Sequence, residues 1–517
     1  MTANAAVTPH HHSARAARRV IEAGGNAVDG AIAAVAAQGV VAPETCGIGG
    51  DLFALVHIPG EDRPRALNAS GRSGANADPE TLRTAGHDQV PPEHPLTVTI
   101  PGCVDGLAVL ADSLGRLPLS DSLAPAIELA EAGFDVSAEQ ARAFTGRAGN
   151  YRDNPAVAGF YPGGDPVSAG DRVARPDLAA TLAAIAADGR DAFYRDRPAE
   201  DVVEAVGGLI TMADMEPDQS EWVDPVGVEA AGLVAWTTPP NSQGYLGPGA
   251  LAVFEMLDPP GDPDSPRWWH LLIESYRSLA WERNDLVADP DHLALPADLL
   301  LDRERLARAA GSISLDRAGD WPAPPGKPSG TAYMCVADEE GMAVSIIQSN
   351  YRGTGSPFGA RRSGFLLQDR GGGFSLVPGH PNELGPGKRP LHTLSPTLWT
   401  EGTRARWLLG TRGGAVQPQL VAQVAAAVLM AGRSSEQAQE APRWTLGDFG
   451  PGVPSAIAVE PGPPPALLDG LEDMGHEIVV REERQPGWGP VGLIGLEGDR
   501  RTAASDPRVD TSAAVLF

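Results

Sequence analysis

The stretch GTAYMCVADEEGMAVSIIQS, residues 330–349, indicates the fold of this chain most directly. Strand-forming residues fill 331–337 and 342–349, and the turn sequence Asp338-Glu-Glu-Gly341 separates them, a pattern that predicts a β-hairpin. The preceding segment, 318–330, is rich in proline and glycine, so we expect an exposed, mobile loop there. The hairpin is therefore predicted to begin at Thr331, directly after an accessible peptide bond.

Thr331 is a candidate nucleophile because of its place at the head of this hairpin. Cleavage of the bond between Gly330 and Thr331 would give Thr331 a free α-amino group. Such an amine has a pKa of about 7.7–8.0 and can act as general base toward the hydroxyl of the same residue. The pattern alone leaves the alternative open, because Gly-Thr pairs are common and most such threonines are structural.

A second candidate element is the glycine pair Gly413-Gly414, which follows the short apolar strand Trp407–Leu409. Two consecutive glycine backbones can turn both N–H groups toward one point, as an oxyanion hole for a tetrahedral intermediate requires. Judged alone, the pair fits an ordinary tight turn equally well.

The rest of the chain alternates between helical and strand-like segments. A helix over 13–23 is followed by Gly24 and Gly25 as its C-cap, and Asn26 and Asp29 open an alanine-rich helix that we expect in the core. Residues 107–145, 177–206 and 418–431 are predicted to be mostly helical, and 52–58, 476–480 and 491–496 to be strands. This mixture predicts one large α/β layered domain with no clean internal boundary.

Composition excludes several classes of protein. The 517 residues include 40 Lys plus Arg and 67 Asp plus Glu, a net charge of −27 that argues against binding to nucleic acid or to anionic membranes. Three cysteines exclude a disulfide framework and a cysteine-based zinc site. No signal peptide and no membrane-spanning apolar run is visible, so we expect a cytoplasmic protein. No metal or organic cofactor is expected, because a hydroxyl, an amine and two N–H donors suffice for the chemistry.

Motifs along nearly the whole chain carry a resemblance to a known family. They are Ala23-Gly-Gly-Asn-Ala-Val-Asp29 after Ser13, Val41-Ala-Pro43, Gly47-Ile-Gly-Gly50, Asp338 with Gly341-Met-Ala-Val-Ser345, Gly385-Pro-Gly-Lys-Arg-Pro390, Leu394-Ser-Pro-Thr397 and Ala504-Ser-Asp-Pro-Arg508. On these motifs the chain resembles the gamma-glutamyltranspeptidase family. The resemblance implies an N-terminal-nucleophile hydrolase fold, a four-layer αββα sandwich. It also implies self-cleavage between Gly330 and Thr331 into a large subunit, 1–330, and a small subunit, 331–517, which stay associated as one structural unit.

The same resemblance implies roles for the catalytic residues. Thr331 falls on the family's nucleophile, which forms an acyl-enzyme. Ser349 falls on the position of a Thr that hydrogen-bonds the nucleophile, and Gly413 and Gly414 fall on the oxyanion-hole pair. The catalytic core is therefore expected to be intact, with no metal.

The substrate-binding residues depart from the family pattern. Ser70 stands where the family has an Arg that grips an α-carboxylate, and Arg72 lies two residues further on. Gly373 replaces the Asp that binds an α-ammonium, while Arg370 replaces a neutral polar residue. The remaining differences are Tyr351 where an Asn is expected, with Asn350 beside it, and His392-Thr393 in place of a Ser-Ser pair.

These replacements change the charge preference of the predicted site. Without the Asp, an ammonium would lack its counterion, whereas a carboxylate facing Arg370 is favoured. We therefore expect a substrate whose recognised end carries a carboxylate and need not carry an α-amine. The segment Phe374–Pro390 is shorter than in relatives with a lid loop, which favours water over an amino-acid acceptor.

Three hypotheses follow from the sequence. The leading one is a self-processing amide hydrolase or acyltransferase that still accepts γ-glutamyl compounds. An alternative is a relative specialised in oxamate, in acylated antibiotic side chains, or in carbon–carbon cleavage in actinobacterial natural-product pathways. The third is a non-catalytic scaffold, against which the retained catalytic residues argue. The expected partners are a small amide or acyl substrate and water, and homodimerisation is left open.

Overall fold

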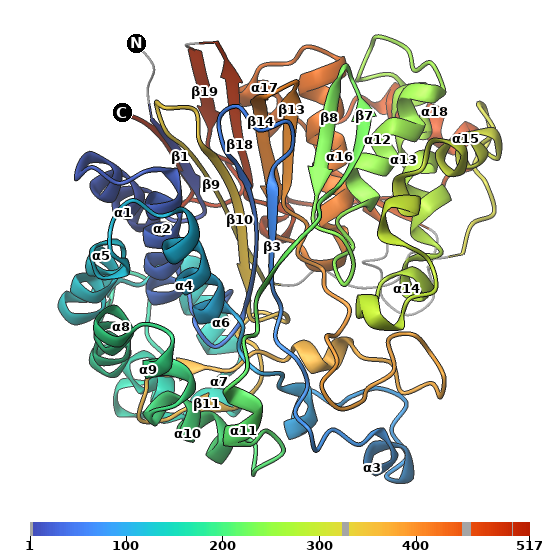
Figure 1. Ribbon diagram of the computed structural model, residues 1–517. Coiled ribbons are helices and arrows are strands. Elements are labelled where there is room, and N and C mark those ends of the chain that lie inside the picture. The colour runs from blue at the N-terminus through green and yellow to red at the C-terminus, as the bar shows by residue number, and fades with distance from the viewer. Residues whose placement is uncertain (1–3, 323–329, 447–455, 499) are drawn as a thin grey trace.

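Two antiparallel β-sheets form the centre of the molecule (Figure 1). The computed structural model describes residues 4–322, 330–446, 456–498 and 500–517. The first sheet has seven strands in the order β20-β1-β9-β10-β2-β3-β6. Their bounds are β1 (Ala5–Thr8), β2 (Asp51–His57), β3 (Arg65–Ala69), β6 (Glu221–Val223), β9 (Ala332–Ala337), β10 (Ala343–Ser349) and β20 (Ala513–Leu516).

The second sheet has six strands in the order β19-β18-β14-β13-β8-β7. Their bounds are β7 (Val226–Ala230), β8 (Leu233–Thr237), β13 (Thr397–Glu401), β14 (Arg404–Thr411), β18 (Val491–Glu497) and β19 (Arg500–Ala504). Both strands of the predicted hairpin, β9 and β10, lie in the middle of the first sheet, so the sequence prediction for this segment is confirmed.

Helices cover the outer face of each sheet. On the seven-stranded sheet, α1, α2 and α4 lie against the strands, and α5 and α8 pack outside them. On the six-stranded sheet, α12 and α16 lie against the strands, with α13, α15 and α18 outside them. The bounds are α1 (His11–Glu22), α2 (Ala27–Val41), α4 (Cys103–Leu114), α5 (Leu119–Ala132), α8 (Pro176–Asp188), α12 (Leu246–Met256), α13 (Pro266–Ala280), α15 (Arg303–Gly311), α16 (Gln417–Ala425) and α18 (Pro465–Asp473).

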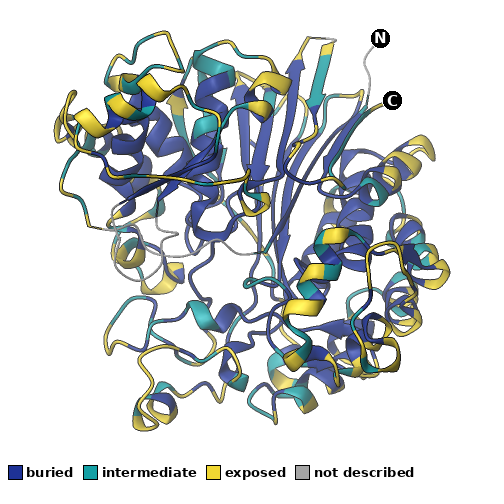
Figure 2. Cartoon of the chain, turned by 180° about the vertical axis from the view of Figure 1, so that it is seen from behind, coloured by how far each residue is buried: buried dark blue, intermediate teal, exposed yellow. Residues whose placement is uncertain are grey.

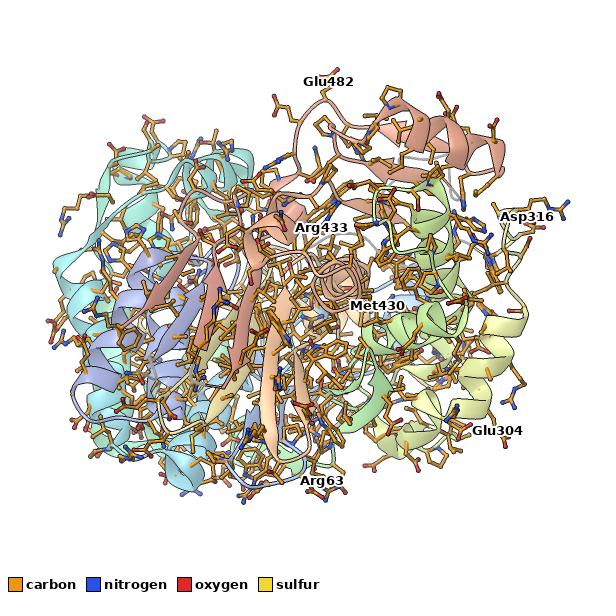
Figure 3. All side chains as sticks on the ribbon, turned by 90° about the horizontal axis from the view of Figure 1, so that it is seen from above. Arg63, Glu304, Asp316, Met430, Arg433 and Glu482 are labelled. Carbon is orange, nitrogen blue, oxygen red and sulfur yellow. The ribbon has the colours of Figure 1, made fainter. Side chains whose placement is uncertain are left out.

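The result is the four-layer αββα sandwich that the resemblance implied. Seen from above, the two sheets lie between the helical layers, and charged residues such as Arg63, Glu304, Asp316 and Glu482 stand on the rim (Figure 3). The strands are buried, while exposed residues gather on the outer helices and loops (Figure 2). Within the described residues, no helix is both long and apolar enough to cross a membrane.

The alanine-rich helix α2 is buried over its whole length, as its composition predicted. Asn26 and Asp29 form a reciprocal capping box at its start, which satisfies N–H groups that the helix itself leaves free. Its small side chains permit close approach. A Cβ added at Gly30 would lie 2.7 Å from Cδ1 of Ile21, so α1 and α2 are in contact where glycine leaves room.

The two sheets meet around the ring of Tyr333 on β9. Gly410 of β14 and Gly492 of β18 are paired across the second sheet, and a Cβ on either would lie within 3 Å of that ring. The Tyr333 hydroxyl lies 2.8 Å from Ser345 Oγ. Two facing glycines thus let β9 approach the second sheet closely near its first residue.

The expected loop over 318–330 is described only in part, because 323–329 lie outside the described residues. Its beginning is held by two hydrogen bonds. The N–H of Ala318 donates to Met474 O at 2.8 Å, and Trp321 Nε1 donates to Glu274 Oε2 at 2.7 Å.

A buried ionic cluster explains the C-terminal motif around Asp506. Its carboxylate pairs with Arg443 at 2.7 Å and with Arg508 at 3.2 Å, and Arg508 also pairs with Glu460. Asp506 additionally accepts the N–H of Val491 at 2.8 Å, which fixes the start of β18. Burial alone would raise the pKa of the Asp506 carboxyl, but the two guanidinium groups hold it below its ordinary value.

We predict that Asp506→Asn lowers the free energy of unfolding by roughly 3–5 kcal/mol, because buried guanidinium charge loses its partner. Denaturant unfolding followed by tryptophan fluorescence measures the loss. The exposed Asp510→Asn is the matched control and should change little. Folding lowers the pKa of Asp506, so its carboxylate stabilises the folded state at pH values above the unfolded pKa of about 3.9. This stabilisation is lost as the pH falls through the pKa of the folded state. An equal loss in both variants would contradict this account.

Candidate active site

Thr331 lies directly before β9, and its side chain is buried beside Ser349 at the end of β10. In the β9–β10 ladder Ala332 is paired with Gln348, so the next residues outward, Thr331 and Ser349, are neighbours on one face. The distance from Thr331 Oγ1 to Ser349 Oγ is 3.3 Å. This face is turned toward the second sheet, since Tyr333, two residues along β9, packs there.

The carbonyl of Gly330 accepts hydrogen bonds from the hydroxyl groups of both Thr331 and Ser349. Thr331 Oγ1 donates to Gly330 O at 2.6 Å and Ser349 Oγ donates to it at 2.9 Å. The N–H of Tyr351 in turn donates to Ser349 Oγ at 2.8 Å. Ser349 is thereby oriented with its proton toward the carbonyl that precedes Thr331.

Gln417, which sequence reasoning did not select, contacts the Thr331 hydroxyl. It is the first residue of α16, and its Nε2 donates to Thr331 Oγ1 at 3.4 Å. Its Oε1 accepts the N–H of Ser395 at 3.1 Å. A single Gln four residues after Gly413 forms no recognisable motif, so only a three-dimensional contact could identify it.

Gly413 and Gly414 form the turn between β14 and α16. Their φ angles are 126° and 57°, a region of backbone conformation that favours glycine. Gly414 opens a short 3₁₀ turn, Gly414–Val416, that leads directly to Gln417. Among the described residues, no hydrogen bond is found from either glycine N–H, so both groups are free to donate.

Arg370 is fully buried and only partly paired. Its Nη1 donates to Thr393 Oγ1 at 3.3 Å, and its guanidinium lies 4.0 Å from the ring centroid of Tyr351. Within the described part of the chain, Nε and Nη2 have no hydrogen-bond partner. Burial lowers the pKa of Arg370 to about 10, which leaves the group charged at neutral pH. Two guanidinium nitrogens therefore remain without an acceptor in this part of the chain.

A series of hydrogen bonds through residues 393–395 and Gln417 connects Arg370 to the Thr331 hydroxyl. Thr393 accepts a hydrogen bond from Arg370, and its carbonyl accepts one from Ser395 Oγ at 3.1 Å. The N–H of Ser395 donates to Gln417, which reaches Thr331. Tyr351 supplies a second connection, because its N–H bonds Ser349 and its ring underlies Arg370. The structure thus brings Thr331, Ser349, Tyr351, Arg370 and Thr393 into one cluster.

His392 lies beside this cluster and is held by Asp51, at the start of β2. His392 Nε2 donates to Asp51 Oδ2 at 2.9 Å, while Asp51 Oδ1 accepts the N–H of Gly71 at 2.9 Å and Gln368 Nε2 at 3.0 Å. Burial, together with the charge of Arg370, lowers the pKa of His392 to about 3. His392 is therefore neutral at physiological pH and adds no positive charge to that of Arg370.

Ser70 and Arg72 are already engaged by other protein groups. Ser70 Oγ accepts Asn241 Nδ2 at 3.1 Å. Arg72 Nη1 donates to Asp289 Oδ2 at 3.2 Å and to Gly387 O at 3.1 Å. Arg72 Nη1 is therefore already bonded to protein acceptors, whereas Nε and Nη2 of Arg370 have no such acceptor among the described residues.

Gly373 and Asn350 flank the cluster. Gly373 ends the 3₁₀ turn that begins at Arg370 and lines a cavity of about 240 Å³. A Cβ added at Gly373 would lie 3.1 Å from Leu391 O. Asn350 Nδ2 donates to Thr354 O at 3.4 Å, and its Oδ1 has no partner among the described residues.

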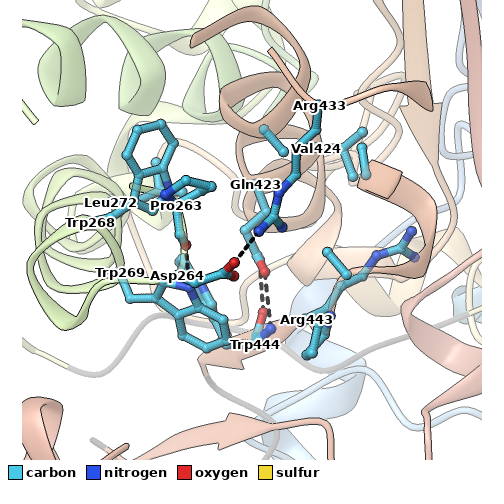
Figure 4. A pocket seen from close by; sticks show the side chains of 14 residues that line it. Pro263, Asp264, Trp268, Trp269, Leu272, Gln423, Val424, Arg433, Arg443 and Trp444 are labelled. Carbon is cyan, nitrogen blue, oxygen red and sulfur yellow. Dashed lines mark hydrogen bonds and ion pairs between the residues drawn. The ribbon is translucent and has the colours of Figure 1, made fainter. Parts of the chain in front are cut away.

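Two polar sites elsewhere have charged groups that are paired within the protein. The pocket in Figure 4 lies between α13 and α16, where Gln423 exchanges two hydrogen bonds with the Trp444 backbone and Arg433 pairs with Asp264. His270, Glu274 and His476 are close enough to hold a metal ion. However, His270 Nδ1 and His476 Nε2 already bond each other at 2.8 Å, and Arg277 donates to Glu274 at 3.0 Å. A guanidinium thus occupies the place of a cation.

Comparison with known proteins identifies the family. The gamma-glutamyltranspeptidase family model matches residues 13–516. The chain is 33% identical to a glutathione hydrolase-like proenzyme of Bacillus subtilis over 515 residues, 98% of this chain and 97% of the relative. It is also 33% identical to the oxamate amidohydrolase proenzyme of Klebsiella pneumoniae over 525 residues, 98% of each chain.

A solved structure has the same fold over almost the whole chain. The cephalosporin acylase of Bacillus halodurans superposes with a TM-score of 0.92 at 31% identity, covering 99% of this chain and 96% of the acylase. The expected N-terminal-nucleophile hydrolase fold is thereby confirmed. Because family model, relatives and fold agree along the whole length, this chain belongs to the gamma-glutamyltranspeptidase family of hydrolases and acyltransferases.

Proposed function

We propose that this protein is a self-processing amide hydrolase whose nucleophile is Thr331 and whose substrate carries a carboxylate. The observation that carries the proposal is the placement of the Thr331 hydroxyl, 2.6 Å from Gly330 O and beside a second hydroxyl that also donates to that oxygen. Residues 1–330 would form the large subunit and 331–517 the small one. The names of these two relatives, both proenzymes, fit a chain that is cut after synthesis.

Self-cleavage would proceed by attack of the Thr331 hydroxyl oxygen on the Gly330 carbonyl carbon. The bond from this carbon to Oγ1 forms, the bond to the Thr331 nitrogen breaks, and that nitrogen takes the hydroxyl proton. Water then hydrolyses the ester, which leaves a carboxylate on Gly330 and a free α-amine on Thr331. The Ser349 proton, aimed at Gly330 O, stabilises the negative charge that develops there.

The same hydroxyl would then attack the substrate amide. The freed α-amine, with a pKa of about 7.7–8.0, accepts the hydroxyl proton and passes it to the leaving amine. The N–H groups of Gly413 and Gly414 are the donors for the oxyanion of the tetrahedral intermediate. Water hydrolyses the resulting acyl-enzyme, and the proton returns to Oγ1.

Arg370 is the proposed recognition group for the substrate carboxylate. A buried guanidinium that leaves two nitrogens unpaired within the described residues is energetically unfavourable until an anion binds. A carboxylate accepts two parallel N–H bonds from such a group. Oxamate, for which one relative is named, has a carboxylate next to its amide and no α-amine, so it is the first substrate to test. A γ-glutamyl amide, an acyl side chain and a scaffold role remain as the alternatives.

Thr331→Ala is expected to remain a single full-length chain and to lose all turnover, because the hydroxyl that attacks both carbonyls is gone. Intact mass spectrometry of the wild type should show two fragments that end at 330 and begin at 331. Thr331→Ser retains a hydroxyl and should still be cut. An active, uncut wild type would refute Thr331 as nucleophile, and an inactive, uncut one would favour the scaffold.

Arg370→Ala is expected to raise the KM for oxamate or another carboxylate-bearing amide by roughly 30-fold, since a charged hydrogen bond contributes about 2 kcal/mol. Self-cleavage should be nearly unchanged, because it involves no free carboxylate. Arg72→Ala provides the comparison, and its KM should stay close to that of the wild type. Steady-state kinetics decide between the two arginines, and an unchanged KM in Arg370→Ala removes it from the site.

Gly373→Asp is expected to shift the preference toward substrates with a free α-amine, because it adds an anion close to Arg370. Gly373→Asn has the same size without the charge, so it separates electrostatics from crowding against Leu391 O. The ratio of kcat/KM for γ-glutamyl and des-amino amides is the measurement. A ratio that moves equally in both variants would show that charge at this position is irrelevant.

A further inference from the structure

We infer that Gln417 is a further catalytic residue, which stabilises the Thr331 hydroxyl oxygen as the acyl-enzyme forms and breaks. The inference rests on the proposed function of Thr331 and adds a residue to it. It starts from the 3.4 Å contact between Gln417 Nε2 and Thr331 Oγ1, between two side chains that are buried from solvent.

The orientation of the Gln417 amide follows from its second partner. The N–H of Ser395 can only donate, so the group that faces it at 3.1 Å must be the side-chain oxygen of Gln417. The NH₂ group is therefore directed at Thr331. Gln417 can only donate to Oγ1 in this arrangement, and the Thr331 proton is left to point toward Gly330 O or Ser349.

The place of Gln417 in the fold limits its movement. It is the first residue of α16, with Pro418 next to it, and it follows the turn that holds Gly413 and Gly414. The proposed oxyanion donors and the Gln417 donor therefore come from one continuous segment. The former would act on the substrate oxygen and the latter on the nucleophile oxygen.

The chemical role follows from the change of charge on Oγ1. In deacylation, a water oxygen bonds to the acyl carbon while the α-amine takes a proton from that water. The bond between the acyl carbon and Oγ1 then breaks, the electron pair stays on Oγ1, and the protonated α-amine returns its proton there. An ester oxygen is a weaker acceptor than the oxygen that leaves, so the Gln417 hydrogen bond strengthens as the bond breaks. An interaction that is stronger in the transition state than in the ground state accelerates the step.

Gln417→Leu is therefore expected to lower kcat roughly tenfold to a hundredfold, at or below the range seen when one oxyanion donor is removed. The acyl-enzyme should accumulate, visible as a mass increase on the small subunit, and KM should not rise. Gln419→Leu is the matched control on the same helix. Gln419 is also buried, but it bonds the backbone of Leu446 and should not cause accumulation.

Gln417→Glu gives an independent readout without loss of volume. A protonated Glu donates to Oγ1 as the amide does, whereas an ionised one cannot donate and repels the developing charge. Its activity relative to wild type, with oxamate or another amide turned over by the wild type, should therefore fall as the pH rises through the pKa of the introduced carboxyl. A purely structural role predicts a ratio that does not change with pH.

The outcomes distinguish a failure of this inference from a failure of the proposed function of Thr331. Accumulated acyl-enzyme in Gln417→Leu and a falling ratio in Gln417→Glu support it. Wild-type kcat in both variants overturns it, as does a raised KM without accumulation, and Thr331 then remains the nucleophile. If the wild type is uncut and inactive, the proposed function and this inference fail together.

Discussion

The pairing register of β9, β10 and β2 is the constraint on which the candidate active site depends. Ala332 is paired with Gln348, and Ser349 with Asp51, so Thr331, Ser349 and Asp51 lie at one end of three adjacent strands. A shift by one residue would turn each side chain to the opposite face. Thr331 would then face the helical layer of α2 and lose Ser349 and the second sheet. Central strands buried on both faces make such a shift costly.

The second requirement is that the two sheets approach closely beside this strand end. Gly410 and Gly492 leave the space that the Tyr333 ring fills, so the end of β14 lies near the start of β9. The turn at Gly413 and Gly414 follows β14 and leads to Gln417, whose side chain contacts the hydroxyl of Thr331 from the second sheet's side. The candidate site is therefore an inter-sheet site, and packing of apolar side chains sets its geometry.

Arg370 differs from two other buried arginines, Arg443 and Arg508, in how its charge is compensated. Arg443 and Arg508 are paired with Asp506 and Glu460, and their charges hold β18 and the C-terminal segment in place. Arg370 is equally buried, but two of its nitrogens have no partner among the described residues. Arg443 also leaves one nitrogen, Nε, without a hydrogen-bond partner in the described residues, but its charge is paired with Asp506. Because an uncompensated buried charge is destabilising, the lack of a carboxylate partner at Arg370 is the basis for proposing it as a binding group.

Local patterns in the sequence were sufficient to predict the hairpin around 338–341, the buried helix over 27–41 and the turn at Gly413. Turn residues, small apolar residues and glycine determine the backbone over a few neighbouring positions, so their effect can be predicted locally. The head of the hairpin made Thr331 a candidate nucleophile, and the resemblance to the family strengthened that role and added Ser349. The engagement of Arg72 by Asp289, 217 residues away, and the contact of Gln417 with Thr331 could not be predicted in this way. Hydrogen bonds between distant segments leave no local signal, since chain folding alone decides which side chains meet.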